Sequence, residues 1–214
     1  MKNLKSIFII GDSYSTFEGY IPEGNSVFYT RVPIRNTDVT RVEETWWHQL
    51  CEKEGLELLL NDSWSGSTIG YTGYNGADTS GTSSFIFRLE KYKQRLVSLM
   101  PDAVIVFGGT NDSWCDAPLG EIKSEIEDPK DLYSVCPAIC YYAKKLRTVL
   151  PRTKILFIIN DEIKEQIKLA IRTACDANQA NYLDLEPVNK LDGHPTVKGM
   201  AEIAEQVSKA LQML

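Results

Sequence analysis

Short apolar runs alternate with longer amphipathic stretches along almost the whole chain. The apolar runs are rich in aliphatic residues and end in turn or polar residues, a pattern typical of buried strands. The longer stretches carry the apolar spacing of helices. The predicted strands span residues 7–10, 56–60, 103–107, 155–159 and 182–185. The predicted helices lie near residues 43–54, 84–99, 131–149, 162–178 and 196–213.

This alternation predicts an α/β fold in which a parallel, five-stranded sheet is covered by helices on both faces, because parallel neighbours need a right-handed crossover. With 214 residues, of which 43% are hydrophobic, the chain can bury one full core and is too short for two comfortable ones. We therefore expect a single domain over residues 1–214. In such sheets, functional groups gather in the loops beyond the carboxyl ends of the strands.

Two segments lack a regular apolar period. Residues 14–42 contain several glycines and prolines, and residues 65–82 are rich in glycine, serine and threonine. Loops of this length in a compact domain are usually functional or mobile. Both are expected to lie over the same edge of the sheet.

The net charge and the lengths of the apolar runs limit the kinds of partner that the protein could bind. The formal net charge is -6 and the basic residues are scattered, which argues against a nucleic-acid partner. The apolar run that follows residues 1–5 is too short for a secretory signal, and no small-residue cleavage site comes after it. No run approaches the roughly 18 apolar residues of a membrane helix. We expect a soluble, cytoplasmic protein with no membrane partner.

The cysteines point to the same compartment. Their number is odd and no C-x-x-C spacing occurs, which suits free thiols in a reducing compartment. They are Cys51, Cys115, Cys136, Cys140 and Cys175. Cys136 and Cys140 share one face of a predicted helix and could in principle bind a metal. Because no histidine or second cysteine pair lies near them in the sequence, core packing is the preferred interpretation.

Candidate chemistry follows the first three predicted strands. Ser13, in Gly11-Asp12-Ser13, stands where a strand bends into the next segment, and a serine there can project its hydroxyl and its N–H into one space. Gly66 follows the second strand and lets the backbone approach a ligand closely. Asn111 follows the third and can offer a neutral donor to a developing oxyanion. Each residue also fits an ordinary turn, cap or loop.

The chain contains only two histidines. His194 stands beside Asp192, just before the last predicted helix, which makes it the candidate general base. His48 lies at helical spacing after Glu44 or Thr45, and we interpret it as a partly buried helix residue outside the site.

In order along the chain, these residues resemble the four sequence blocks of the SGNH or GDSL hydrolase superfamily. The blocks are Gly11-Asp12-Ser13, Gly66, Gly108-Gly109-Thr110-Asn111-Asp112 and Asp192-Gly193-His194-Pro195. The resemblance covers almost the entire chain and implies a flavodoxin-like three-layer α/β/α sandwich. It also implies hydrolysis of an ester, often acetyl or another short acyl ester, by a serine enzyme with no metal and no other cofactor.

The resemblance assigns roles residue by residue. It makes Ser13 the nucleophile and His194 the general base. It makes the backbone N–H groups of Ser13 and Gly66, together with the side chain of Asn111, the oxyanion hole. Asp192, the nearest carboxylate to His194 in the sequence, is our candidate for the third catalytic residue.

The supporting carboxylate departs from the family pattern. The family places an aspartate three residues before the histidine, but Leu191 occupies that position and Asp192 is two before. In extended backbone, residues two apart point to the same side, so Asp192 can still reach the ring. If it does not, a backbone carbonyl could hold the second ring nitrogen, which would leave a Ser-His dyad.

Aromatic residues in the strand-end loops hint at the substrate. They are Tyr14, Trp64, Tyr71, Tyr74 and Trp114. Aromatic rings mixed with Asn, Asp and Ser resemble sugar-binding surfaces more than a lipid groove, which favours a carbohydrate or other polar small-molecule ester. The alternative is that these rings pack the long loops. Tyr14 and Trp114 are the candidate substrate-binding residues.

Two other functions compete with ester hydrolysis. A non-catalytic glycan-binding protein on the same fold would explain the unusual spacing of Asp192, although it has no need for both Ser13 and His194. A metal-dependent phosphohydrolase could use Asp12, Asp112 and Asp192 as ligands. The sequence leaves open the acyl and alcohol parts of the substrate and the oligomeric state.

Overall fold

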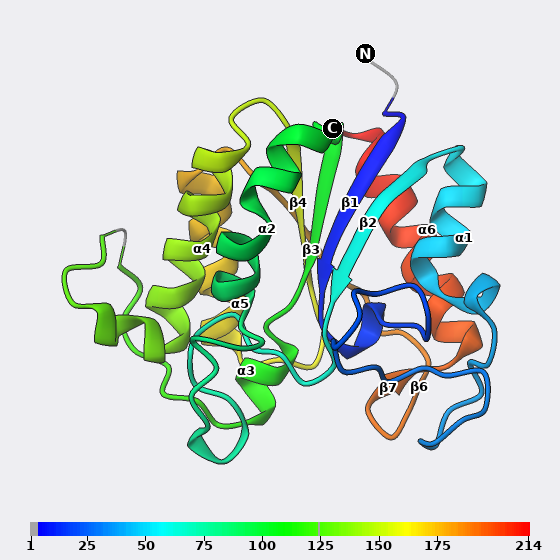
Figure 1. Ribbon diagram of the computed structural model, residues 1–214, viewed down its shortest axis with the longest axis horizontal. Coiled ribbons are helices and arrows are strands. Elements are labelled where there is room, and N and C mark those ends of the chain that lie inside the picture. Colours follow the sequence, from blue (N-terminus) through cyan, green and yellow to red (C-terminus); the bar gives the residue numbers. More distant parts are fainter. Residues whose placement is uncertain (1–3, 124) are drawn as a thin grey trace.

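A computed structural model describes residues 4–123 and 125–214. Its central feature is a five-stranded parallel sheet with the strand order β2-β1-β3-β4-β5 (Figure 1). The strands are β1 (Ser6–Gly11), β2 (Glu57–Ser63), β3 (Ala103–Phe107), β4 (Lys154–Ile159) and β5 (Asn181–Asp184). This is the order of the flavodoxin-like sheet. The middle strands β1, β3 and β4 are buried along nearly their whole length, which explains their continuous aliphatic sequences.

Helices cover both faces of the sheet. They are α1 (Trp46–Glu54), α2 (Phe85–Leu99), α3 (Thr110–Trp114), α4 (Val135–Val149), α5 (Glu165–Ala177) and α6 (Val197–Gln212). Figure 1 shows α1 and α6 on one face and α2, α4 and α5 on the other. Two apolar cores result, one on each side of the sheet. The predicted three-layer α/β/α architecture is confirmed.

Short elements complete the chain. Short 3-10 helices are formed by η1 (Ser13–Ser15), η2 (Val42–Glu44), η3 (Tyr74–Gly76) and η4 (Pro129–Tyr133). A two-stranded antiparallel hairpin is formed by β6 (Lys190–Leu191) and β7 (His194–Pro195). The sequence pattern did not predict this hairpin, because strands of two residues are too short to show a period.

Strand β2 runs further than predicted. Its last residues, Asn61, Asp62 and Ser63, are polar, yet they continue the parallel pairing with β1 and are fully enclosed. The apolar run alone predicted a strand that ends at residue 60. Backbone pairing and buried hydrogen bonds carry the strand three residues further, to the edge where the loops after β1 and β3 also begin.

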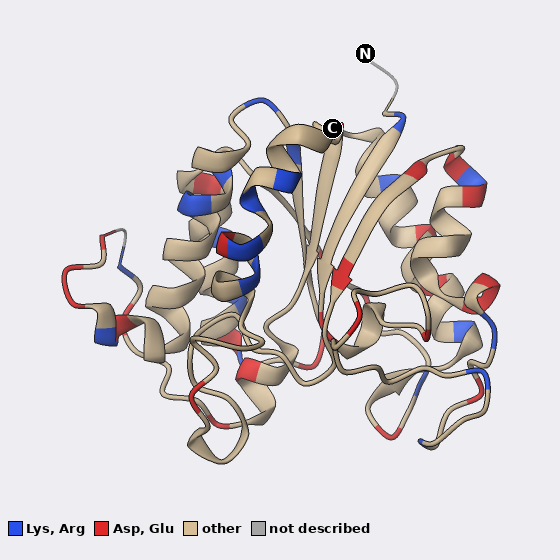
Figure 2. Ribbon diagram, in the orientation of Figure 1, with Lys and Arg blue, Asp and Glu red and all other residues tan. Residues whose placement is uncertain are grey.

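The distribution of charged residues and the state of the cysteines agree with the sequence analysis. Acidic and basic residues are interspersed over the outer helices (Figure 2). All five cysteines are free, and Cys136 and Cys140, which belong to α4, are buried in the core. Among the described residues, no helix is both long and apolar enough to cross a lipid bilayer. The cytoplasmic location stays a prediction.

Candidate active site

Ser13 lies in a sharp turn at the carboxyl end of β1. The strand ends at Gly11, where an added Cβ would lie 2.6 Å from Ser63 Oγ, so only glycine fits beside β2. Asp12 then caps η1, because its carboxylate accepts a hydrogen bond of 3.1 Å from the N–H of Tyr14. This turn puts Ser13 at the edge of the sheet with only 3% of its surface exposed.

His194 reaches Ser13 from the other end of the chain. Its Nε2 atom lies 3.0 Å from Ser13 Oγ, although 181 positions separate the two residues in the sequence. Its Nδ1 atom lies 3.3 Å from the backbone carbonyl oxygen of Asp192. A carbonyl oxygen only accepts hydrogen bonds, so this contact favours the tautomer that carries its proton on Nδ1. Nε2 is then free to accept the proton of Ser13.

The carboxylate of Asp192 does not orient the histidine. Asp192 and Gly193 join β6 to β7 with φ angles of 48° and 75°, the two positive values that a type I′ hairpin turn requires. The extended backbone that would let Asp192 reach the ring therefore does not occur, and the turn directs the side chain away from it. Its Oδ2 atom accepts a hydrogen bond of 2.6 Å from the Asn36 side chain. The backbone carbonyl holds the ring instead.

Two tyrosine hydroxyls hold the backbone on either side of His194. Tyr14 donates to the carbonyl oxygen of Gly193, and Tyr29 donates to that of Pro195 at 3.1 Å. Phe28 stacks on the imidazole, with ring centroids 3.6 Å apart and planes inclined by 5°. The backbone and the ring plane of His194 are thus both fixed without a charged partner.

Burial lowers the pKa of His194 below its ordinary value of 6.5. The hydrogen bond with the Asp192 carbonyl acts in the opposite direction, and the positive charges of Arg35 and Lys190 lower the pKa further. The imidazole is therefore neutral at pH 7, the state in which it can accept a proton.

The three expected oxyanion donors lie at neighbouring strand ends. Gly66 has a φ of +82°, and a Cβ added there would meet no atom within 4 Å, so its backbone borders open space. Within the described chain, neither the N–H of Ser13 nor that of Gly66 donates to a protein acceptor. The amide nitrogen of Asn111 donates one hydrogen to Ser67 O at 3.0 Å and keeps a second.

A buried polar network holds these loops in place. Arg88 from α2 is 1% exposed and forms an ion pair of 3.1 Å with Asp62 at the end of β2. It also donates to Gly11 O at 3.1 Å and to Ser67 Oγ at 3.2 Å. One guanidinium therefore joins the ends of β1 and β2 to the loop that contains Gly66.

The carboxylates considered as metal ligands have other roles. Asp112 accepts hydrogen bonds of 3.0 Å from the N–H of Ile69 and is fully enclosed, and burial raises its pKa to about 6. Burial raises the pKa of Asp12 to about 7. Asp192 is bound to Asn36. Among the residues that the structure describes, no group of three or more His, Cys, Asp or Glu side chains could hold a metal ion.

The structure places the two predicted substrate-binding residues, Tyr14 and Trp114, in different surroundings. Tyr14 has no exposed surface and uses its hydroxyl on Gly193, so its assignment as a substrate contact was wrong, because η1 turns the side chain inward. Trp114 is 36% exposed and lies edge-on to His194 at 5.7 Å between ring centroids. It remains a candidate. His48 lies within α1 and apart from this cluster, as expected.

Sequence reasoning missed Phe28 and Tyr29, which belong to a loop with no periodic pattern. It noted Tyr74 as an aromatic loop residue and did not place it in the site. Tyr74 is 42% exposed, and its hydroxyl donates to Asn111 Oδ1 at 2.8 Å. Its neighbours in the sequence gave no signal of this contact, which depends on how the loop folds back.

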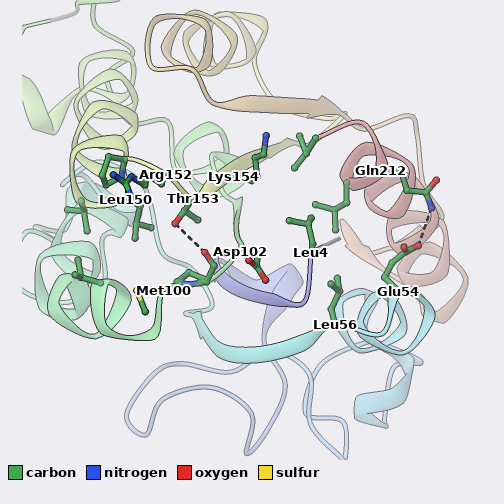
Figure 3. Close-up of a pocket in the computed structure, with 16 residues that line it drawn as sticks. Leu4, Glu54, Leu56, Met100, Asp102, Leu150, Arg152, Thr153, Lys154 and Gln212 are labelled. Atoms are coloured by element: carbon green, nitrogen blue, oxygen red, sulfur yellow. Dashed lines mark hydrogen bonds between the residues drawn. The ribbon is translucent and has the colours of Figure 1, made fainter. Parts of the chain in front are cut away.

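A hollow of about 1070 Å³ lies at the opposite edge of the sheet (Figure 3). Its lining includes Leu4, Leu56, Asp102 and Lys154, which precede or begin the strands. Ser13 and His194 follow the carboxyl ends of the strands, so this hollow is separate from the candidate active site.

The model of the family described as GDSL-like Lipase/Acylhydrolase matches residues 5–211. A Bacteroides ovatus protein assigned as a GDSL-like lipase is 40% identical, with a TM-score of 0.91 and both chains covered completely. A Bacteroides uniformis protein with the same assignment is 38% identical, with a TM-score of 0.89, over 100% of this chain and 98% of the other. No curated protein matches the chain.

More distant structures share the fold. An acetyl xylan esterase from the rumen bacterium Butyrivibrio proteoclasticus is 15% identical with a TM-score of 0.62, over 98% of this chain and 63% of the other. The family match spans nearly the whole sequence, and the two Bacteroides structures agree with it in both sequence and fold. The chain therefore belongs to the GDSL-like lipase/acylhydrolase family and is a carboxylic ester hydrolase.

Proposed function

We propose that the protein hydrolyses a short acyl ester, with Ser13 as the nucleophile and His194 as the general base. The observation that carries this proposal is the contact of 3.0 Å between Ser13 Oγ and His194 Nε2. A nucleophile must lie within hydrogen-bond reach of its base, and this pair meets that requirement without any movement.

The reaction proceeds through an acyl-enzyme. His194 Nε2 takes the proton of Ser13 as Oγ bonds to the ester carbonyl carbon, and the carbonyl electron pair moves onto oxygen. The N–H groups of Ser13 and Gly66 and the Asn111 amide stabilise that oxyanion. When the carbonyl reforms, the bond to the alcohol breaks and His194 gives the alcohol its proton. Water then repeats the sequence and releases the acid.

The base works as a dyad with backbone support. The carbonyl of Asp192 accepts a hydrogen bond from Nδ1–H and stabilises the imidazolium that forms during attack. A carboxylate would do so more strongly, because a charged acceptor makes a stronger hydrogen bond. The aromatic and tyrosine contacts around His194 supply the orientation that a carboxylate supplies in a triad.

The surroundings of Ser13 favour a small acyl group on a polar alcohol. Ser13 is 3% exposed, so a small acyl group reaches its hydroxyl with the least steric hindrance. The half-exposed rings of Tyr74 and Trp114 offer flat surfaces of the kind that sugars contact. The fold neighbours that are named as carbohydrate esterases, including the acetyl xylan esterase, are consistent with a carbohydrate ester.

The test compares Ser13→Ala with Ser98→Ala, a substitution on the outer surface of α2, using p-nitrophenyl acetate. Loss of the nucleophile should lower kcat at least about a thousandfold, while the surface variant should match the parent enzyme. Full activity in Ser13→Ala would contradict the assignment.

A second test concerns the substrate. With the parent enzyme, acetyl esters should be cleaved faster than octanoyl esters, and acetylated xylo-oligosaccharides should be substrates. A preference for octanoyl esters would contradict the proposed substrate class.

A further inference from the structure

The side-chain amide of Asn111 is held by two partners. Its Nδ2 atom donates to Ser67 O at 3.0 Å, and because a backbone carbonyl only accepts, this contact fixes which end of the amide is nitrogen. Its Oδ1 atom then faces the Tyr74 hydroxyl, which donates to it at 2.8 Å. Tyr74 is therefore the partner of the carbonyl end of the expected oxyanion donor.

Tyr74 is presented by a small, internally bonded loop. An antiparallel bridge pairs Thr72 with Asp78, and the Gly73 N–H donates to Ala77 O at 2.8 Å. The hydroxyl of Thr72 donates to Tyr133 O at 2.7 Å, which ties the loop to the segment before α4. The position of Tyr74 is thus determined by the loop backbone, while 42% of its surface remains open to solvent.

We propose that Tyr74 is a positioning residue for oxyanion stabilisation and that it acts through Asn111. This inference rests on the proposed function, in which the Asn111 amide is an oxyanion donor. A donor on Oδ1 draws electron density away from nitrogen, so the remaining N–H of Nδ2 becomes a stronger donor to the oxyanion. The same hydrogen bond prevents the amide from rotating away from the reacting carbonyl.

The phenol is suited to this role at neutral pH. Burial, and the negative charge nearby that includes Asp12 and Asp112, raise the pKa of Tyr74 to about 12. The hydroxyl therefore remains protonated and continues to donate at neutral pH.

The first test is Tyr74→Phe, which keeps the ring and removes only the hydroxyl. Loss of one hydrogen bond of ordinary strength predicts a fall in kcat of about tenfold, with little change in KM for p-nitrophenyl acetate. Tyr20→Phe is the matched control, because Tyr20 is 44% exposed and lies outside the site. A Tyr74→Phe enzyme with the parent kcat would overturn the inference.

A double-mutant cycle tests whether Tyr74 acts through Asn111. In an Asn111→Ala background the Tyr74→Phe change should cause no further loss of kcat, since the group that it positions is gone. A full additional tenfold loss would mean that Tyr74 acts independently and would overturn the inference. Asn111→Ser replaces Asn111→Ala in the cycle if the alanine variant does not fold, as judged by circular dichroism.

The two proposals can fail separately. If Ser13→Ala keeps its activity, the proposed function itself is wrong. If Ser13→Ala is inactive and Asn111→Ala is impaired while Tyr74→Phe behaves as the parent enzyme does, only the role of Tyr74 is wrong.

Discussion

His194 is oriented by uncharged groups, and this sets its protonation behaviour. The carbonyl of Asp192 accepts from Nδ1, Phe28 covers one face of the ring, and the Asp192 carboxylate binds Asn36. A neighbouring carboxylate would favour the imidazolium and raise the pKa of the histidine. Burial without that carboxylate favours the neutral ring.

The resulting prediction concerns pH. His194 acts as a base only when neutral, so activity should fall as pH decreases through its pKa, and the direction of the shift places that midpoint below 6.5. Imidazole NMR signals can report the pKa directly, since the chain has only two histidines and His48→Gln assigns the other. A midpoint above 6.5 for His194 would indicate a carboxylate partner and contradict the observed arrangement.

At the scale of elements, the β6–β7 hairpin carries the histidine. The dipeptide Asp192-Gly193 is a strong signal for a two-residue hairpin turn, and it explains why the aspartate faces away from the ring. Strands β6 and β7 have two residues each, which is too short to show an alternation of apolar and polar positions. The turn residues were therefore visible in the sequence, whereas the hairpin and the direction of the Asp192 side chain were not.

Gly193→Ala should damage both stability and catalysis. Gly193 has a φ of +75°, and an added Cβ would lie 3.1 Å from the Trp114 ring. The left-handed conformation should lower the free energy of unfolding by about 1–2 kcal/mol. The contact with Trp114 should also displace the hairpin and lower kcat.

Gly55→Ala is the matched control for that variant. Gly55 ends α1 with a φ of +64°, and no atom lies within 4 Å of its added Cβ. The Gly55→Ala variant should lose a similar amount of the free energy of unfolding, as measured in urea, and its kcat should not change. If Gly193→Ala also left kcat unchanged, the hairpin would not be what positions His194.

At the scale of the whole molecule, the sheet order brings distant segments to one edge. Strand β1 lies between β2 and β3 (Figure 1). The segments that follow these strands and contain Ser13, Gly66 and Asn111 therefore become neighbours. The alternation of strands and helices predicted that the strand ends meet at one edge, but it did not predict the order of the strands. The contacts of Phe28 and Tyr29 with the hairpin were not predictable, because they depend on the path of an irregular loop.

Arg88 should be the main stabiliser of this edge. Replacing it with methionine leaves Asp62 buried without its partner, and losses of about 3–5 kcal/mol are typical when one member of a buried pair is removed. Lys93→Met on the same helix breaks an exposed pair with Glu90 and should cost less than about 1 kcal/mol. Urea unfolding of the two variants measures the difference, and equal losses would contradict this role of Arg88.

The most direct test of the Ser13–His194 dyad is the rate of labelling by a fluorophosphonate, with mass spectrometry to locate the adduct. Asp192→Asn keeps a residue that tolerates the left-handed turn, and it can still bind Asn36. The account predicts an adduct on Ser13 at similar rates in the parent enzyme and in Asp192→Asn, and none in His194→Ala. Labelling that fails in Asp192→Asn, or an adduct on another serine, would contradict it.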